Sequence, residues 1–63
     1  MRAIHWLLLD NLIKGFSYRC NMTLNDADRA MNWAIENGFA KDGKITDEGR
    51  GYFMLHKHEK PSE

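Results

Sequence analysis

The side chains that most often carry chemistry in proteins are present in this sequence, but they are poorly grouped along it. A nucleophilic thiol needs a neighbouring base, and Cys20, the single cysteine, has Arg19 beside it and no histidine nearby. Among the three histidines, His56 and His58 stand two positions apart and therefore diverge on a helix. His5 would have to approach them from the opposite end of the chain. We therefore expect no catalytic residue, no bound metal and no cofactor, and hence no enzymatic activity.

The acidic residues have a structural explanation. Asp26 and Asp28 lie where a helix is expected to begin, and carboxylates are favourable at this positive end of a helix. Asp47 and Glu48 stand in the same position before a later helix. The glycines from position 38 onward fall at turns and at a helix start, with the spacing of neither a phosphate loop nor a dinucleotide-binding fingerprint. These residues therefore inform us about the fold rather than about a catalytic site.

Two segments in the first half of the chain have the spacing of helices. Residues 2–14 carry apolar side chains around more than half of a helical circumference, which indicates a helix buried on two sides, or buried on one side and bound on the other. A buried strand over residues 4–9 is the competing interpretation. Thr23 begins a capping-box pattern, with Asp26 in place of glutamate, before a second helix that closes at Gly38, and Asn25 is the alternative cap. The inner stripe of this second helix would consist of Ala27, Ala30, Met31, Ala34 and Ile35.

The sequence Asp42-Gly43 between two short runs indicates a β-hairpin. This dipeptide is typical of a two-residue type I′ turn, which requires a positive φ at the glycine. The corresponding register pairs Lys41 with Lys44 and Ala40 with Ile45. Because the arms would be only about three residues long, the hairpin needs support from the helices, and a plain loop is the alternative.

A third helix would begin at Thr46 or Asp47. Gly49 and Gly51 weaken its first turn by about 1 kcal/mol each relative to alanine. We expect a single globular domain over residues 1–59, followed by a flexible tail over residues 60–63. The expected fold class is mainly α: a small three-helix domain with a possible short β-hairpin, or wing, between helices 2 and 3.

Residues 25–53 resemble the second half of a winged-helix domain. In that family a helix ends in a hydrophobic-x-x-Gly-hydrophobic turn, which is here Ile35-Glu36-Asn37-Gly38-Phe39. A short wing containing Asp-Gly follows, and Thr-x-x-Gly-Arg, here residues 46–50, begins a final helix. The chain departs from the family because one helix, not two, precedes the candidate recognition helix. The resemblance implies a DNA-binding regulator as the alternative function, with contacts from Lys41, Lys44, Arg50 and Arg19.

The balance of charges disfavours nucleic acid as the partner. Lys and Arg number 9 and Asp and Glu number 9, which gives a formal net charge of zero, whereas dedicated polyanion binders carry a clear basic excess. The second helix has a net charge of −2, because Arg29 is outnumbered by Asp26, Asp28 and Glu36. An acidic helix enters a groove lined by phosphates at a cost.

Small size, neutral charge and apolar surface favour a non-enzymatic protein-interaction module, an adaptor or inhibitor of the kind common among phage proteins. The expected partner-binding residues are Trp33, Arg29, Trp6 and Glu36. Trp33 lies outside the inner stripe of the second helix, so it either packs sideways on the N-terminal segment or the tail, or forms a partly exposed anchor. A chain of 63 residues without a disulfide is marginally stable on its own, so a homodimer is a further expectation.

The N-terminal apolar run does not read as a targeting segment. It is interrupted by His5 and stopped by Asp10-Asn11, and it is far shorter than the roughly 20 apolar residues that span a bilayer. The free cysteine and the four methionines fit a reducing compartment. We therefore expect a cytoplasmic protein without a membrane span.

Overall fold

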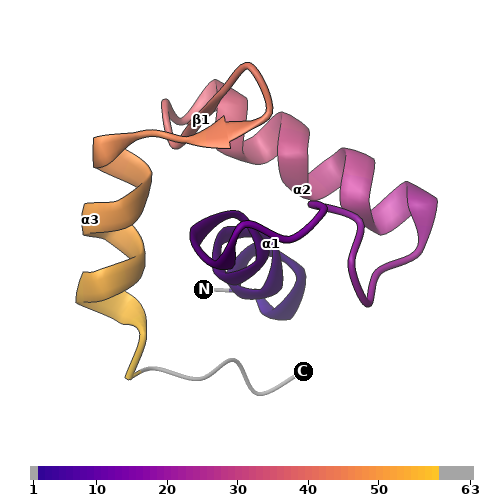
Figure 1. Cartoon of the computed structure of the whole chain (residues 1–63), viewed down its shortest axis with the longest axis horizontal. Helices are drawn as coiled ribbons and strands as arrows, with labels where there is room; N and C mark the ends of the chain where they lie inside the picture. Colours follow the sequence, from indigo (N-terminus) through magenta and orange to yellow (C-terminus); the bar gives the residue numbers. More distant parts are fainter. Residues whose placement is uncertain (1, 59–63) are drawn as a thin grey trace.

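The computed structural model describes residues 2–58, in which three helices and a small β-hairpin follow one another along the chain (Figure 1). Their bounds are α1 (Ala3–Lys14), α2 (Leu24–Glu36), β1 (Ala40–Lys41), β2 (Lys44–Ile45) and α3 (Asp47–His56). This confirms a mainly α domain with a hairpin between the second and third helices, and it excludes a strand over residues 4–9. The tail expected over residues 60–63 lies outside the described residues.

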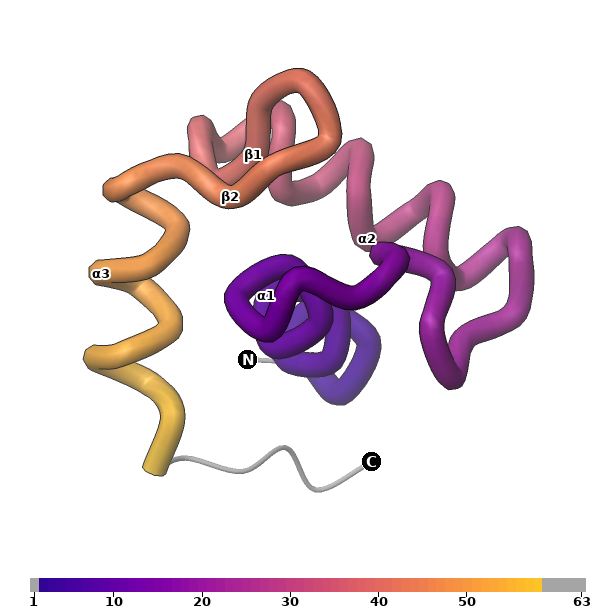
Figure 2. The backbone as a smooth tube through the Cα atoms, in the orientation of Figure 1, coloured from indigo at the N-terminus to yellow at the C-terminus, as the bar shows by residue number. Residues whose placement is uncertain are grey.

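Helix α1 lies between the other two helices (Figure 1). It contacts α2 on one side and α3 on the other, and β2 also packs against it. Leu8 and Leu9 are both fully buried, although adjacent residues point about 100° apart on a helix. Of the two alternatives that the sequence left for α1, the structure shows burial on two sides, and its partners come from the same chain. Figure 2 shows how the hairpin leads from the end of α2 to the start of α3 alongside α1.

Two threonines begin α2 and α3 through the same contact. The side-chain oxygen of Thr23 accepts a hydrogen bond from the Asp26 N–H at 3.1 Å, and that of Thr46 accepts one from the Gly49 N–H at 3.1 Å. Each cap satisfies one of the free donors at a helix N-terminus. The Thr46 hydroxyl also donates to the carbonyl of Gly38 at 2.6 Å. One side chain therefore caps α3 and ties it to the end of α2.

The hairpin has the predicted register. Asp42 and Gly43 form its turn with φ of 53° and 75°, and a type I′ turn requires positive values at both positions. The paired residues are Ala40 with Ile45 and Lys41 with Lys44. The hydrogen bond from the Thr46 N–H to the Phe39 carbonyl, at 2.9 Å, closes the open end of the hairpin. The alternative of a plain loop is therefore excluded.

The buried face of α2 differs from the predicted stripe at one residue. Its three alanines, Ala27, Ala30 and Ala34, are fully buried and allow close approach to α1. Ile35 is 53% exposed, so its assignment to the inner stripe was wrong. The reason is that α2 turns its other flank inward, where Trp33 is covered by aromatic side chains of α1 and α3.

Gly49 and Gly51, which sequence reasoning treated alike, stand in different surroundings. Gly49 is buried, and a Cβ atom there would clash with the Phe39 carbonyl and lie 2.8 Å from Cγ1 of Ile45. A Cβ atom on Gly51 would meet nothing within 4 Å. The absence of a side chain at Gly49 therefore lets the first turn of α3 approach the hairpin. Helix propensity alone gives only the destabilising effect of this glycine.

Candidate functional site: an apolar hollow with two basic side chains

A hollow of about 380 Å³ opens on the surface where the end of α1, the hairpin and α3 meet. Its lining consists of Leu12, Gly15, Phe16, Gly43, Lys44, Ile45 and Arg50. The apolar side chains come from the end of α1 and from β2, and the two charged ones, Lys44 and Arg50, are both basic. This lining suits a ligand that offers an apolar group and an anionic group together.

The end of α1 places Phe16 beside the hollow. Gly15 ends the helix in the left-handed conformation, with φ of 78°, and so turns the chain out of the helical path. The Phe16 N–H then donates to the Asn11 carbonyl at 2.9 Å, which fixes the backbone just beyond the turn. The Phe16 side chain remains 55% exposed. A fixed, half-exposed aromatic ring is the kind of residue that protein interfaces favour.

The two cations of the hollow are available for an anion. Neither the Lys44 nor the Arg50 side chain forms a hydrogen bond or ion pair within residues 2–58. The neighbouring Lys14, by contrast, is paired with Asp10 at 3.1 Å, one turn earlier on α1. The lining itself contains no carboxylate. The charged side chains that line the hollow are therefore all basic, although the net charge of the chain is zero.

A second feature is the aromatic cluster around Trp33, which joins all three helices. The His5 ring of α1 stacks on Trp33 with centroids 3.9 Å apart and an interplanar angle of 3°. Phe39 and Tyr52 approach Trp33 edge-on, at 5.3 Å and 6.0 Å, and stack on each other at 4.5 Å. Trp33 is therefore half-buried, and the predicted sideways packing on the N-terminal segment is confirmed.

The structure brings three of the four predicted partner residues to one face. Arg29 and Glu36 are exposed on α2, one turn before and one turn after Trp33. Trp6 lies elsewhere: its ring is tilted against Phe53 of α3, with centroids 5.5 Å apart. Its Nε1 atom is buried and has no hydrogen-bond partner in the described part of the chain. Trp6 is therefore placed as a packing residue between α1 and α3.

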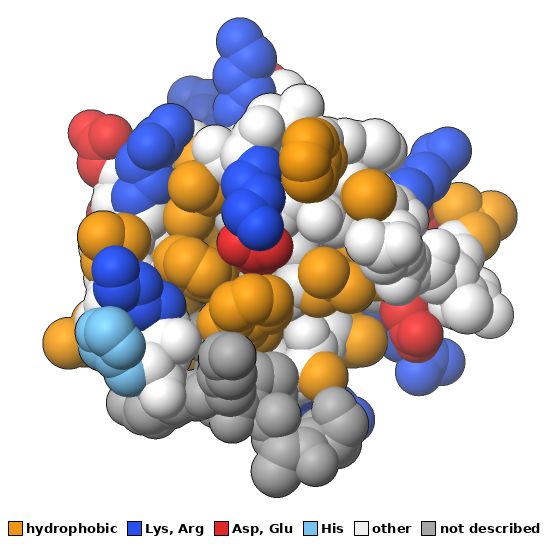
Figure 3. All heavy atoms as spheres, turned by 60° about the horizontal axis from the view of Figure 1, so that its bottom comes forward, with side chains coloured by type: hydrophobic (Ala, Val, Ile, Leu, Met, Phe, Trp, Pro, Cys, Tyr) orange, Lys and Arg blue, Asp and Glu red, His pale blue; other side chains and the backbone are white. Residues whose placement is uncertain are grey.

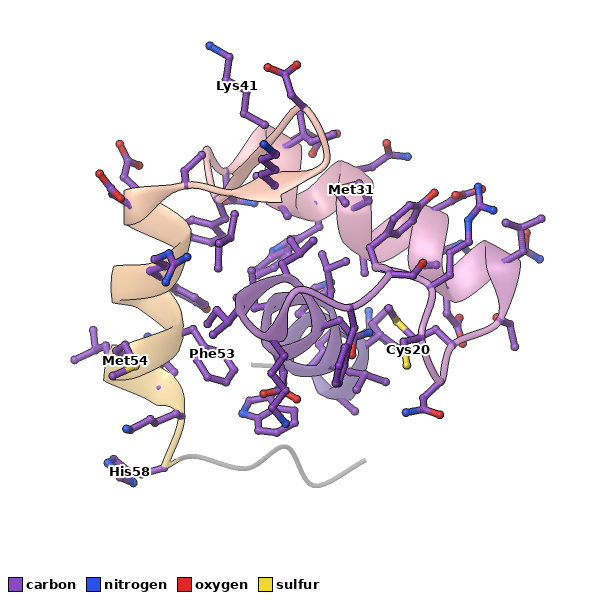
Figure 4. All side chains as sticks on the ribbon, in the orientation of Figure 1. Cys20, Met31, Lys41, Phe53, Met54 and His58 are labelled. Carbon is purple, nitrogen blue, oxygen red and sulfur yellow. The ribbon has the colours of Figure 1, made fainter. Side chains whose placement is uncertain are left out.

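The residues implied by the winged-helix resemblance are divided between sites. Lys44 and Arg50 meet at the hollow, whereas Lys41 points away from the body of the protein (Figure 4). Nε of Arg19 donates to the hydroxyl of Tyr18 at 3.2 Å, and its guanidinium lies 5.3 Å from the centre of that ring. The hydrogen bond with Tyr18 raises the pKa of Arg19, so the guanidinium keeps its charge. These four residues thus form no single basic surface.

Sequence reasoning missed the apolar part of the hollow. Leu12 and Phe16 are four residues apart, but Ile45 is far from both in the sequence, and no motif connects it with them. It also missed Asn11, which is 2% exposed and whose Nδ2 donates to the Cys20 carbonyl at 2.9 Å. One local signal was available, because an apolar residue directly after a glycine cap frequently packs against the last turn of the helix.

Over residues 2–58, no group of three His, Cys, Asp or Glu side chains is placed to hold a metal ion. None of the helices α1, α2 and α3 has the length and apolar character that crossing a membrane requires. Comparisons with protein-family models, curated proteins and solved structures found no match. Function is therefore inferred from the hollow and from the exposed residues around it.

Proposed function

We propose that this chain is a small non-enzymatic protein-interaction module, an adaptor or inhibitor, that binds a protein partner through exposed apolar and aromatic surface. The observation that carries the proposal is the hollow, where the half-exposed ring of Phe16 stands beside the unpaired side chains of Lys44 and Arg50. Aromatic residues and arginine are enriched at the centres of protein interfaces.

The apolar surface continues beyond the hollow along α3. Met54 is 55% exposed and lies one turn beyond Arg50, and Leu55 is 73% exposed. Figure 4 shows the contrast on this helix: Phe53 points toward α1, while Met54 points away from it. On the face turned forward in Figure 3, hydrophobic side chains are exposed and Lys and Arg side chains stand around them. A mixed surface of this kind supports contact with a protein.

The outer face of α2 is the second surface in the proposal. It offers Arg29, Glu36 and the exposed part of Trp33, which are the residues that the sequence itself suggested. Trp33 has two roles here, because its stack on His5 holds α1 and α2 together while its remaining surface faces outward. The hollow is the stronger candidate, since its side chains have fewer partners within the chain.

Site-specific photocrosslinking in the native host tests the proposal. A benzophenone amino acid is placed at Phe16 in the hollow, at Arg29 on α2, or at Leu24, which is 60% exposed at the end of α2 farthest from the hairpin. We expect one discrete crosslinked protein from position 16 and none from position 24. Equal crosslinking from all three positions, or none from positions 16 and 29, would contradict a dedicated partner surface.

The alternative function is a winged-helix-like DNA-binding regulator. The order of three helices with a hairpin between the second and third is compatible with that layout, and Lys41 and Lys44 are paired across the hairpin. An electrophoretic shift assay with arbitrary duplex DNA at low salt decides between the two functions. A DNA-binding protein should shift the duplex at tens of micromolar through phosphate contacts alone. We expect no shift, because α2 is acidic.

A further inference from the structure

We propose that the hollow between α1, the hairpin and α3 binds a short peptide segment of the partner in which a large apolar side chain stands next to carboxylates. This inference rests on the proposed function and adds the chemistry of the ligand to it. Its two parts are the apolar lining of the hollow and the two unpaired cations beside it.

The volume and the apolar lining of the hollow favour a large apolar side chain of the bound peptide. Its volume of about 380 Å³ lies at the lower end of the range of ligand pockets, about 300–1,000 Å³, so one or two side chains fill it. Leu12 and Ile45 contribute apolar side chains to its lining, and Phe16 adds an aromatic ring. An inserted leucine or phenylalanine would remove these side chains from water, which is favourable in proportion to the apolar area covered.

Lys44 and Arg50 favour acidic residues next to the apolar side chain of the bound peptide. Lys44 comes from β2 and Arg50 from α3, so the two charges stand on different walls of the hollow. A guanidinium binds a carboxylate through two parallel hydrogen bonds, and an ammonium adds a second, less directional contact. Because neither charge has a partner within residues 2–58, an acidic peptide gains both contacts without breaking an existing pair.

A peptide fits these features better than a nucleic-acid backbone does. Phosphates would use Lys44 and Arg50, but they would leave the apolar side chains of Leu12 and Ile45 without a matching group. The hollow is therefore a small, mixed site rather than part of a continuous basic track.

Selection from a library of random twelve-residue peptides tests this inference directly. The full chain is immobilised, and a parallel selection on the Phe16→Ser variant removes peptides that bind elsewhere. Phe16 is 55% exposed, so this substitution leaves most of the core untouched. We expect the enriched peptides to share one leucine or aromatic residue next to aspartate or glutamate. Enrichment of basic peptides, or of apolar peptides without an acidic residue, would overturn the inference.

A matched pair of charge reversals then measures the contribution of the cations. The best selected peptide is titrated by fluorescence anisotropy against wild type, Arg50→Glu and Lys57→Glu. Lys57 is exposed at the C-cap of the same helix, about two turns beyond Arg50, and does not line the hollow. We expect Arg50→Glu to weaken binding about tenfold or more, and Lys57→Glu to change it less than threefold. Equal effects would mean that only the overall charge matters, which contradicts the inference.

Two further results separate failure of the inference from failure of the proposed function. If photocrosslinking at Phe16 captures a partner whose binding Arg50→Glu leaves unchanged, the module function stands and the acidic ligand is wrong. A Lys44→Gln variant repeats this comparison with a smaller charge change.

Sedimentation of the wild-type chain at high concentration tests a second copy as the occupant. A dimer that Phe16→Ser dissociates would overturn the inference, whereas a monomer supports it.

Discussion

The rings of His5 and Trp33 lie nearly parallel, with their centroids 3.9 Å apart, and so join the start of α1 to the second half of α2. Two more rings, Phe39 and Tyr52, meet Trp33 edge-on and extend this contact to α3. Because α1 otherwise separates α2 from α3, this aromatic cluster is where all three helices are connected. Trp33 therefore belongs to the proposed binding surface of α2 and also holds α2 against the other helices.

Replacing Trp33 with alanine should therefore destabilise the fold. The side chain is half-buried and touches three rings, so we expect a loss of about 2–4 kcal/mol in the free energy of unfolding, near the lower part of the range for a large aromatic residue. Urea denaturation followed by circular dichroism measures it. Met54→Ala, at a 55% exposed position, is the control with little expected change. A Trp33→Ala protein as stable as that control would mean that the stack contributes nothing.

Alanine at the two glycines of α3 should change stability in opposite directions. At Gly49 the new methyl group would meet the Phe39 carbonyl and Ile45, and we expect a loss of about 1–3 kcal/mol or more. At Gly51 there is open space, so alanine should raise stability by about 0.5–1 kcal/mol through helix propensity alone. Thermal melts of both variants under one set of conditions test this. A shift of the same sign in both would contradict the described approach of α3 to the hairpin.

The hairpin turn should need a residue that tolerates positive φ. Gly43 has φ of 75°, and valine there should destabilise the protein by about 1–2 kcal/mol or more, because β-branched side chains clash in this conformation. Asparagine, which tolerates the left-handed region, is the matched control and should cost less. The measurement is the melting temperature of each variant. Equal melting temperatures for Gly43→Val and wild type would be evidence of an open loop.

Replacing Trp6 with phenylalanine should not lower the stability of the protein substantially. Its Nε1 atom is buried without a hydrogen-bond partner in the described part of the chain, which costs about 1–3 kcal/mol. Phenylalanine removes this donor and keeps an aromatic ring against Phe53. Loss of packing volume offsets part of the gain, so we expect stability to stay within about 1 kcal/mol of wild type or to rise. A loss above about 2 kcal/mol in urea unfolding would show that the indole N–H is satisfied.

Features decided by a few adjacent residues were predictable from the sequence. Thr23 and Thr46 carry their own capping geometry, and Asp42-Gly43 determines both the turn and the register of the strands beside it. The breadth of the apolar surface on α1 likewise indicated burial on two sides. Each of these signals acts within about one turn of chain, so no knowledge of the helix crossings was needed.

Features that depend on how the helices cross were not predictable. Ile35 has the spacing of a core residue, yet the stack of His5 on Trp33 turns α2 so that Ile35 faces outward. The hollow forms because Gly49 lets α3 approach the hairpin and because α1 ends beside them. Such long-range contacts are not encoded in any local pattern, which is why the sequence alone suggested Lys44 and Arg50 but not Phe16 as their neighbour.

A partner segment that occupies the hollow should change the amide chemical shifts of the residues around it. The selected peptide is titrated into the isotope-labelled full chain, and ¹H–¹⁵N spectra are recorded to saturation. We predict that the largest shifts fall on residues that line the hollow on α1's end, the hairpin and α3: Gly15, Phe16, Gly43, Lys44, Ile45 and Arg50. Largest shifts over Arg29–Glu36 with these amides unmoved would contradict the account.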